Sequence, residues 1–250
     1  PAHRASHSGI DTPLDRTIAA LTDQIRTAAA AHTALRICGG GTKDFFGQGN
    51  LQGEPLDTRG LNGILSYEPS ELVVTVGAGT PLAELEAVLA EHGQCLAFEP
   101  PHFSWSSATQ AGSLGEQSPY GGATAGSAAT VGGMVATGLS GPARASAGAV
   151  REYVLGLHMV NGRGEALVYG GQVMKNVAGY DVSRMMVGSM GTLGLITQVS
   201  LKVLPVAPAE ATLVFALDQA SALACLHRGG GPPLPRHASC WVHDNTAGPA

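Results

Sequence analysis

The first regular pattern of apolar and polar positions along the chain lies between residues 14 and 28. Apolar side chains recur there every three or four positions, and this spacing is typical of an amphipathic helix. Thr12, Pro13 and Asp15 stand where an N-cap, a first-turn proline and a capping-box acid are expected. We therefore predict a helix that follows Thr12.

Short apolar runs predict strands in the same third of the chain, at Leu35–Cys38, residues 63–67 and residues 72–76. A second helix is predicted to open after Gly79-Thr80-Pro81, with Gly93 as its C-terminal glycine. The first third of the chain is therefore interpreted as βαβ-like with extra strands.

The pattern changes at residues 103–130, which are poor in branched aliphatic residues and rich in Ser, Gly, Ala and Thr. This composition predicts a loop. Beyond it we predict a strand pair around a turn at residues 161–164, a strand that ends at Pro205, and a helix capped by Asp218. Two further strands are predicted at residues 212–217 and 237–243. A domain boundary is placed near residues 205–211.

Composition sets outer limits on function. The chain has 250 residues, 44% of them hydrophobic and 13% charged, so it can bury a sizeable core. A net charge of −5 argues against nucleic acid as a partner. No apolar run is long enough for a transmembrane segment, so we expect a cytoplasmic protein and leave open peripheral contact with the inner membrane. Four widely spaced cysteines indicate no metal site.

The candidate chemistry begins with the glycine run that follows the predicted strand at residues 35–38. Gly39, Gly40 and Gly41 offer several backbone N–H groups to one concavity, and Thr42 and Lys43 follow with a hydroxyl and a cation. The run lacks the P-loop pattern and the Rossmann pattern. A tight turn with no ligand is an equal alternative for this run taken by itself.

Three more glycine clusters, at residues 132–133, 138–141 and 188–194, are interpreted as lying at strand ends. A long dinucleotide extended across a domain needs several close approaches of the backbone. The clusters together favour a dinucleotide bound by several loops.

Five pieces of sequence occur in a fixed order: GGGT, the proline pair at 100 and 101, TVGGMVATGLSGP, GAVREYVLGLHMVNGRGE and KNVAGYDVSRMMVGSMGTLGLITQVSLKVLP. Over roughly residues 35–206 the chain resembles the FAD-binding domain of the vanillyl-alcohol oxidase and p-cresol methylhydroxylase family. Within that family it is most similar to the FAD-binding subunits of type E in bacterial glycolate oxidase.

The resemblance implies an α+β fold, a two-lobed PCMH-type FAD-binding domain at residues 14–205. Its lobes would span about 14–95 and 96–205, with an insertion at 103–130. Residues 1–13 would form an N-terminal tail and residues 206–250 a short, partial cap domain.

The resemblance also implies a set of residues that bind FAD. The pyrophosphate would lie in a loop of Gly39, Gly40, Gly41 and Thr42, next to Lys43. The isoalloxazine end would lie near Pro100 and Pro101. The central path, the ribose region and the adenine half would be lined by Thr130, Gly132, Gly133, Thr137, Gly148, Gly191, Gly194 and Ile196. Relatives with covalent FAD use a His or Cys, and Thr42 and Lys43 stand in place of such a His, so non-covalent FAD is expected.

Two departures from the family pattern affect the expected chemistry. The insertion after His102 is longer than the family leads us to expect, and the HxGDGNxH-like motif of related 2-hydroxy-acid dehydrogenases is absent at residues 243–245. No catalytic base is assigned. His158 is interpreted as a core histidine, while His102 and the pair Lys175 and Asp181 stay open.

The function implied is that of an FAD-binding subunit in a complex that oxidises glycolate, a small 2-hydroxy acid, to glyoxylate and passes electrons onward. The partners implied are a larger FAD-linked subunit and an iron–sulfur subunit. Two alternatives remain: a self-sufficient FAD-dependent 2-hydroxy-acid dehydrogenase, and a non-catalytic assembly subunit with a degenerate flavin pocket. The FAD domain of an enolpyruvyl-glucosamine reductase is disfavoured.

Overall fold

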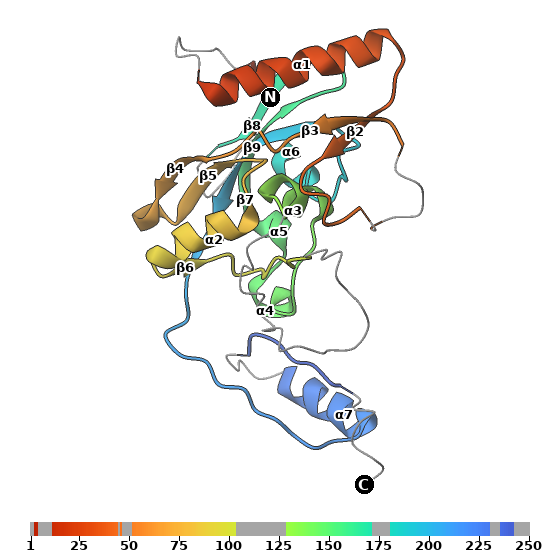
Figure 1. Cartoon of the computed structure of the whole chain (residues 1–250). Helices are drawn as coiled ribbons and strands as arrows, with labels where there is room; N and C mark the ends of the chain where they lie inside the picture. Colours follow the sequence, from red (N-terminus) through yellow and green to blue (C-terminus); the bar gives the residue numbers. More distant parts are fainter. Residues whose placement is uncertain are drawn as a thin grey trace, which may run out of the picture.

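A computed structural model describes residues 3–4, 12–44, 46, 52–103, 129–171, 181–230 and 236–242 (Figure 1). The first helix, α1, is Pro13–Ala30, and it begins as predicted. The Thr12 hydroxyl accepts from the backbone N–H of Asp15 at 3.1 Å, and the Asp15 carboxylate accepts from the backbone N–H of Thr12 at 3.2 Å. This reciprocal pair satisfies donors that a helix start leaves unpaired.

A six-stranded antiparallel sheet in the order β1-β8-β7-β9-β5-β4 forms the centre of the molecule. Its strands are β1 (His3–Arg4), β4 (Ile64–Glu68), β5 (Val73–Gly77), β7 (Val154–Val160), β8 (Ala166–Gly170) and β9 (Leu195–Lys202). The predicted hairpin is confirmed, because β7 and β8 pair around a turn in which Gly164 N–H donates to Asn161 O at 2.9 Å.

The two predicted lobes share this sheet, because β5 pairs directly with β9. The division of the domain near residue 95 stays a prediction. Residues of β5, β7 and β9 are buried with those of helix α2 (Leu82–Glu91) in one hydrophobic core. Gly93 follows α2 with a φ of +63°, the left-handed conformation expected for a C-terminal glycine.

The second half of the chain contains the short helices α3 (Val131–Thr137), α4 (Arg144–Ala147), α5 (Val150–Tyr153) and α6 (Val182–Met185), and a 3₁₀ turn, η1, lies at Pro69–Glu71. In Figure 1, α3, α5 and α6 lie against the sheet, and α4 lies further from it. The placement of Gly132 and Gly133 at a strand end was wrong, since both lie in the first turn of α3. The Thr130 hydroxyl caps this helix by accepting from Gly133 N–H at 3.2 Å.

A separate parallel pair joins β2 (Leu35–Cys38) to β3 (Glu54–Asp57). The sequence analysis predicted β2 and missed β3. The pair is held to α1, because the Gln24 amide donates to Pro55 O at 3.1 Å. This pairing fixes the direction in which the chain enters the glycine run.

The third sheet is a two-residue ladder between β6 (Gln94–Cys95) and β10 (Leu204–Pro205), after which the chain leaves the core. The predicted helix after Asp218 is confirmed as α7 (Gln219–Gly230). The strand predicted at residues 212–217 was wrong, and so was the described part of the strand predicted at 237–243, because neither has a pairing partner among the described residues.

Several expectations lie outside the described residues: most of the insertion at 103–130, Lys175, and the cap residues 243–245. Among the helices that the structure describes, none combines the length and apolarity needed to cross a bilayer.

Candidate functional site

The loop that follows β2 presents five consecutive backbone N–H groups that have no acceptor among the described residues. None of the N–H groups of residues 39–43 donates a hydrogen bond to a described residue, although the loop carbonyls of Gly41 and Lys43 do accept, from Asp44 and Phe46. Backbone N–H groups that have no protein acceptor need water or a ligand as their partner. A run of unpaired donors around a concavity is the geometry of an anion-binding loop.

The loop forms one wall of a cavity of about 160 Å³. Twelve of the fifteen residues predicted to bind FAD line it: Gly39, Gly40, Gly41, Thr42, Lys43, Thr130, Gly132, Gly133, Thr137, Gly191, Gly194 and Ile196. The volume is below the roughly 300–1,000 Å³ of pockets that enclose a drug-sized ligand. The described residues therefore surround only part of a dinucleotide.

Two glycines bring neighbouring segments into direct contact at the cavity. Gly132 N–H donates to Ala78 O at 2.7 Å, and a Cβ on Gly132 would lie 2.9 Å from that oxygen. A Cβ on Gly39 would lie 2.6 Å from the Thr130 hydroxyl. Real Cβ atoms do not approach so closely, so the width of the cavity depends on the absence of side chains at these positions.

The loop at residues 188–194 closes another side of the cavity. It is held to the end of α3, because Gly188 N–H donates to Val135 O at 3.0 Å and Met190 N–H donates to Ala136 O at 2.9 Å. Gly191 has a φ of +76° and packs against Ile37 of β2. The loop thus reaches back to the strand that leads into the glycine run.

Lys43 is the cation that faces the cavity. Burial lowers the pKa of its ammonium group, and its Nζ lies 5.8 Å from the centre of the Phe103 ring. It forms no ion pair with any residue that the structure describes. A partly desolvated cation without a carboxylate partner favours the binding of an anion.

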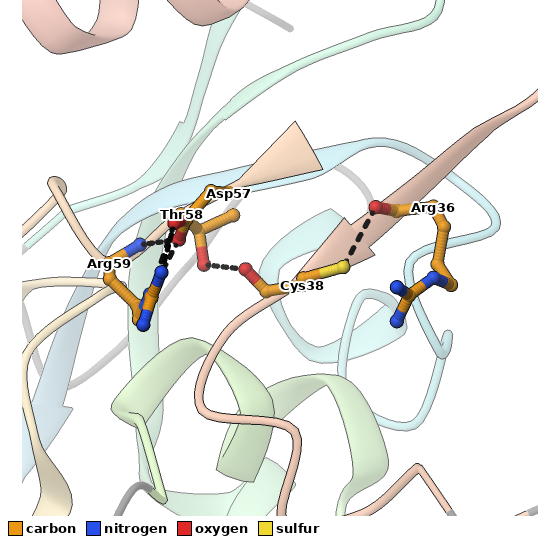
Figure 2. Close-up of polar contacts among 5 residues, drawn as sticks. All are labelled: Arg36, Cys38, Asp57, Thr58 and Arg59. Atoms are coloured by element: carbon orange, nitrogen blue, oxygen red, sulfur yellow. Dashed lines mark hydrogen bonds and ion pairs between the residues drawn. The ribbon is translucent and has the colours of Figure 1, made fainter. Parts of the chain in front are cut away.

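The other charges near the loop are already paired. Figure 2 shows Arg59 beside Asp57, at 2.6 Å, and the Thr58 hydroxyl donating to Cys38 O at 3.0 Å. Arg36 lies 3.5 Å from Asp44. The two arginines, their carboxylate partners and Cys38 line a second hollow of about 420 Å³, which is also lined by the three glycines of the loop. Since each arginine there has a carboxylate partner, Lys43 carries the uncompensated charge of the described loop.

Comparison with known proteins adds the decisive observation. Residues 16–123 match the family described as FAD binding domain. The glycolate oxidase subunit GlcE of Escherichia coli is 42% identical over 222 residues, which are 89% of this chain and 57% of the relative. Residues 16–123 therefore belong to the FAD-binding domain family.

More distant relatives are similar over a smaller part of this chain. The glycolate oxidase subunit GlcD of Bacillus subtilis is 31% identical over 66% of this chain and 30% of its own length. A D-lactate dehydrogenase of Archaeoglobus fulgidus is 33% identical over 56% of this chain and 26% of its own length. The chain therefore spans between about a quarter and somewhat over half of these curated relatives.

A solved structure has a similar fold. A solved alkyldihydroxyacetonephosphate synthase superposes with a TM-score of 0.53 at 21% identity, covering 76% of this chain and 33% of the synthase. The predicted α+β PCMH-type fold is confirmed, and FAD is the cofactor of the domain.

The cavity of this FAD-binding domain suits a dinucleotide. A Cβ on Gly133 would touch only the Thr130 hydroxyl, at 3.1 Å, so its other side is open toward the cavity. The five unpaired N–H groups and Lys43 can hold two phosphates without further cations. Which residues contact which part of FAD stays a prediction.

Three predicted residues do not line the cavity. Pro100 and Pro101 follow Glu99, whose carboxylate accepts from Ala143 N–H at 2.8 Å. Gly148 ends α4 with a φ of +94°. Their assigned contacts with the flavin ring and the ribose are not tested by this geometry.

The cavity also contains residues that the sequence analysis did not select: Ile37, Asp44, Thr58, Ala78, Ala136, Met190 and Leu195. Thr58 and Ala78 each directly follow a strand, β3 and β5. Their position at strand ends is the signal that could have identified them. His158 lies in β7, where burial lowers the pKa of its imidazole, and it does not line the cavity.

Proposed function

We propose that this chain is the FAD-binding subunit of a cytoplasmic glycolate oxidase complex, which oxidises glycolate to glyoxylate and passes the electrons onward. A larger FAD-linked subunit and an iron–sulfur subunit would be its partners. Bound FAD supplies a two-electron acceptor for such an oxidation. The observation that carries the proposal is the donor-rich loop of residues 39–43, found in a chain 42% identical to a glycolate oxidase subunit.

The lining of the cavity supports a role in holding FAD more than a role in proton transfer. Oxidation of a 2-hydroxy acid requires a base for the hydroxyl proton. Among the described residues of the lining, Lys43 and Asp44 are the charged ones, and Asp44 is paired with Arg36. We therefore assign the substrate base to the partner subunit and not to this chain.

One specific observation favours a second candidate, a self-sufficient FAD-dependent 2-hydroxy-acid dehydrogenase. Similar proteins include a D-lactate dehydrogenase and a D-2-hydroxyglutarate dehydrogenase of Xanthomonas citri, the latter 30% identical over 77% of this chain. This candidate requires the isolated chain to reduce its own flavin with a 2-hydroxy acid. The non-catalytic assembly subunit requires that no flavin binds.

The test is a visible absorption spectrum of the purified chain with added FAD, followed by acid precipitation. The proposal expects flavin bands that stay with the protein on gel filtration and move to the supernatant in acid. Glycolate should then bleach these bands only after the larger flavoprotein subunit is added. Bleaching by the isolated chain would favour the second candidate, and a colourless chain that takes up no FAD would leave only the assembly subunit.

A further inference from the structure

An ion pair anchors the segment that precedes the insertion. His102 Nε2 lies 2.8 Å from Oε2 of Glu86, on helix α2. The two side chains are 14% and 33% exposed. A pair so short and so little exposed differs from the surface pairs that contribute almost nothing, because solvent screens it less.

The anchored segment reaches Lys43, which lines the cavity. Phe103, the residue after His102, places its ring 5.8 Å from Nζ of Lys43. Helix α2 is held to the opposite wall, since Leu82 N–H donates to Ala129 O at 2.8 Å and Val131 N–H donates to Thr80 O at 3.0 Å. The capping residue Thr130 lies between these two bonds and lines the cavity. One helix thus connects the wall at Thr130 with the segment under Lys43.

We propose that Glu86 and His102 form a latch that positions Phe103 beneath Lys43 and so sets the affinity of the cavity for FAD. Both are positioning residues, because neither lines the cavity. The inference rests on the FAD binding of this domain.

The Glu86 carboxyl of this pair is partly desolvated. Burial is the main cause that raises the pKa of the Glu86 carboxyl, and the hydrogen bond and charge of His102 act against it. His102 is the charged group that acts on Glu86 among the described residues. Glu99 and Glu210 act with Glu86 on Cys95 of β6, and the Glu99 carboxylate is bonded to Ala143 N–H.

The test is a titration of the full chain with FAD, followed by flavin fluorescence. Glu86→Gln should weaken binding about tenfold. His102→Gln should do the same, and the double variant should show no further loss. Thermal unfolding without FAD checks that each variant is folded.

Glu210→Gln is the matched control, because Glu210 lies 3.4 Å from His237 in a pair whose side chains are 62% and 61% exposed. It should keep the affinity of the unmodified chain. Glu86→Gln with unchanged affinity would overturn the latch, and so would a double variant that binds FAD more weakly than either single variant, since losses from two independent sites add. An unmodified chain that binds no FAD would contradict the cofactor itself as well as the latch.

Discussion

Residues 73–77 and residues 212–217 have similar apolar sequences, VVTVG and TLVFAL, and opposite structures. The first segment is β5, buried along its whole length between β4 and β9. The second is unpaired among the described residues, and Leu213 and Val214 are 77% and 88% exposed. The difference teaches that an apolar, β-branched sequence becomes a strand only where a neighbouring strand accepts its hydrogen bonds.

The same contrast holds for the wider regions. The body of the molecule, residues 52–103 and 129–205, contains fully buried leucines on α2 and on the sheet. The C-terminal region, residues 206–242, has Ala222 as its buried apolar residue among those described. Figure 1 shows α7 apart from the sheet. The stability of the FAD-binding fold should therefore depend on the first region and hardly on the second.

The largest expected effect comes from replacing one leucine by alanine in each of the two regions. Leu85→Ala removes a fully buried side chain of α2 and should lower the free energy of unfolding by about 2–5 kcal/mol. Leu213→Ala changes a side chain that is 77% exposed and should stay within about 0.5 kcal/mol. Urea unfolding followed by circular dichroism measures both. Equal losses would show that the C-terminal region is part of the cooperative core.

Replacing a glycine that lines the cavity should have a smaller effect on the free energy of unfolding. Gly132→Ala places a Cβ 2.9 Å from atoms of Ala78, and such overpacking costs about 1–3 kcal/mol. FAD binding should weaken with it, because α3 must move. The measurement is an FAD titration beside thermal unfolding.

Gly162→Ala is the control for this replacement, since a Cβ there meets no atom within 4 Å. It should leave both the FAD affinity and the thermal unfolding of the chain unchanged. If Gly132→Ala behaved like this control, the close approach at Ala78 would have no role in shaping the cavity.

The smallest expected effect is a local one in the C-terminal region. Hydrogen bonds from the Ser221 backbone and hydroxyl lower the pKa of Asp218 below its ordinary 3.8. Its contribution to the start of α7 is therefore complete above pH 3.8 and lost as pH falls through the lower, folded value. The amide chemical shift of Ser221 should titrate with a midpoint below 3.8, without a matching change in β9. A midpoint at or above that value would contradict the cap.

The parts of the fold that could be predicted from sequence are those with strong local signals. The start of α1 is fixed by Thr12 and Asp15, and the β7–β8 hairpin by its turn residues. The glycine loop could be predicted because unpaired donors after a strand are a local property of residues 39–43.

The parts that could not be predicted depend on distant partners. β3 has one buried residue, Leu56, and contains Pro55, so its pairing with β2 leaves almost no pattern in the sequence. Helix α3 has two glycines in its first turn, which disfavour a helix. It forms because Thr130 caps it and because Ala78 O accepts from Gly132 N–H. Ala78 and Ala136 reach the cavity through this packing alone.

The unpaired donors of residues 39–43 belong to the main chain, and this decides which substitutions can detect them. Exchanging the side chain of Thr42 leaves its N–H in place, so alanine replacement there should pass almost unnoticed by a bound phosphate. Proline removes the N–H and fixes φ. A proline scan of this loop would therefore map the contacts with phosphate one amide at a time, and an anion site of this kind can tolerate wide variation in side chains while its backbone function stays intact.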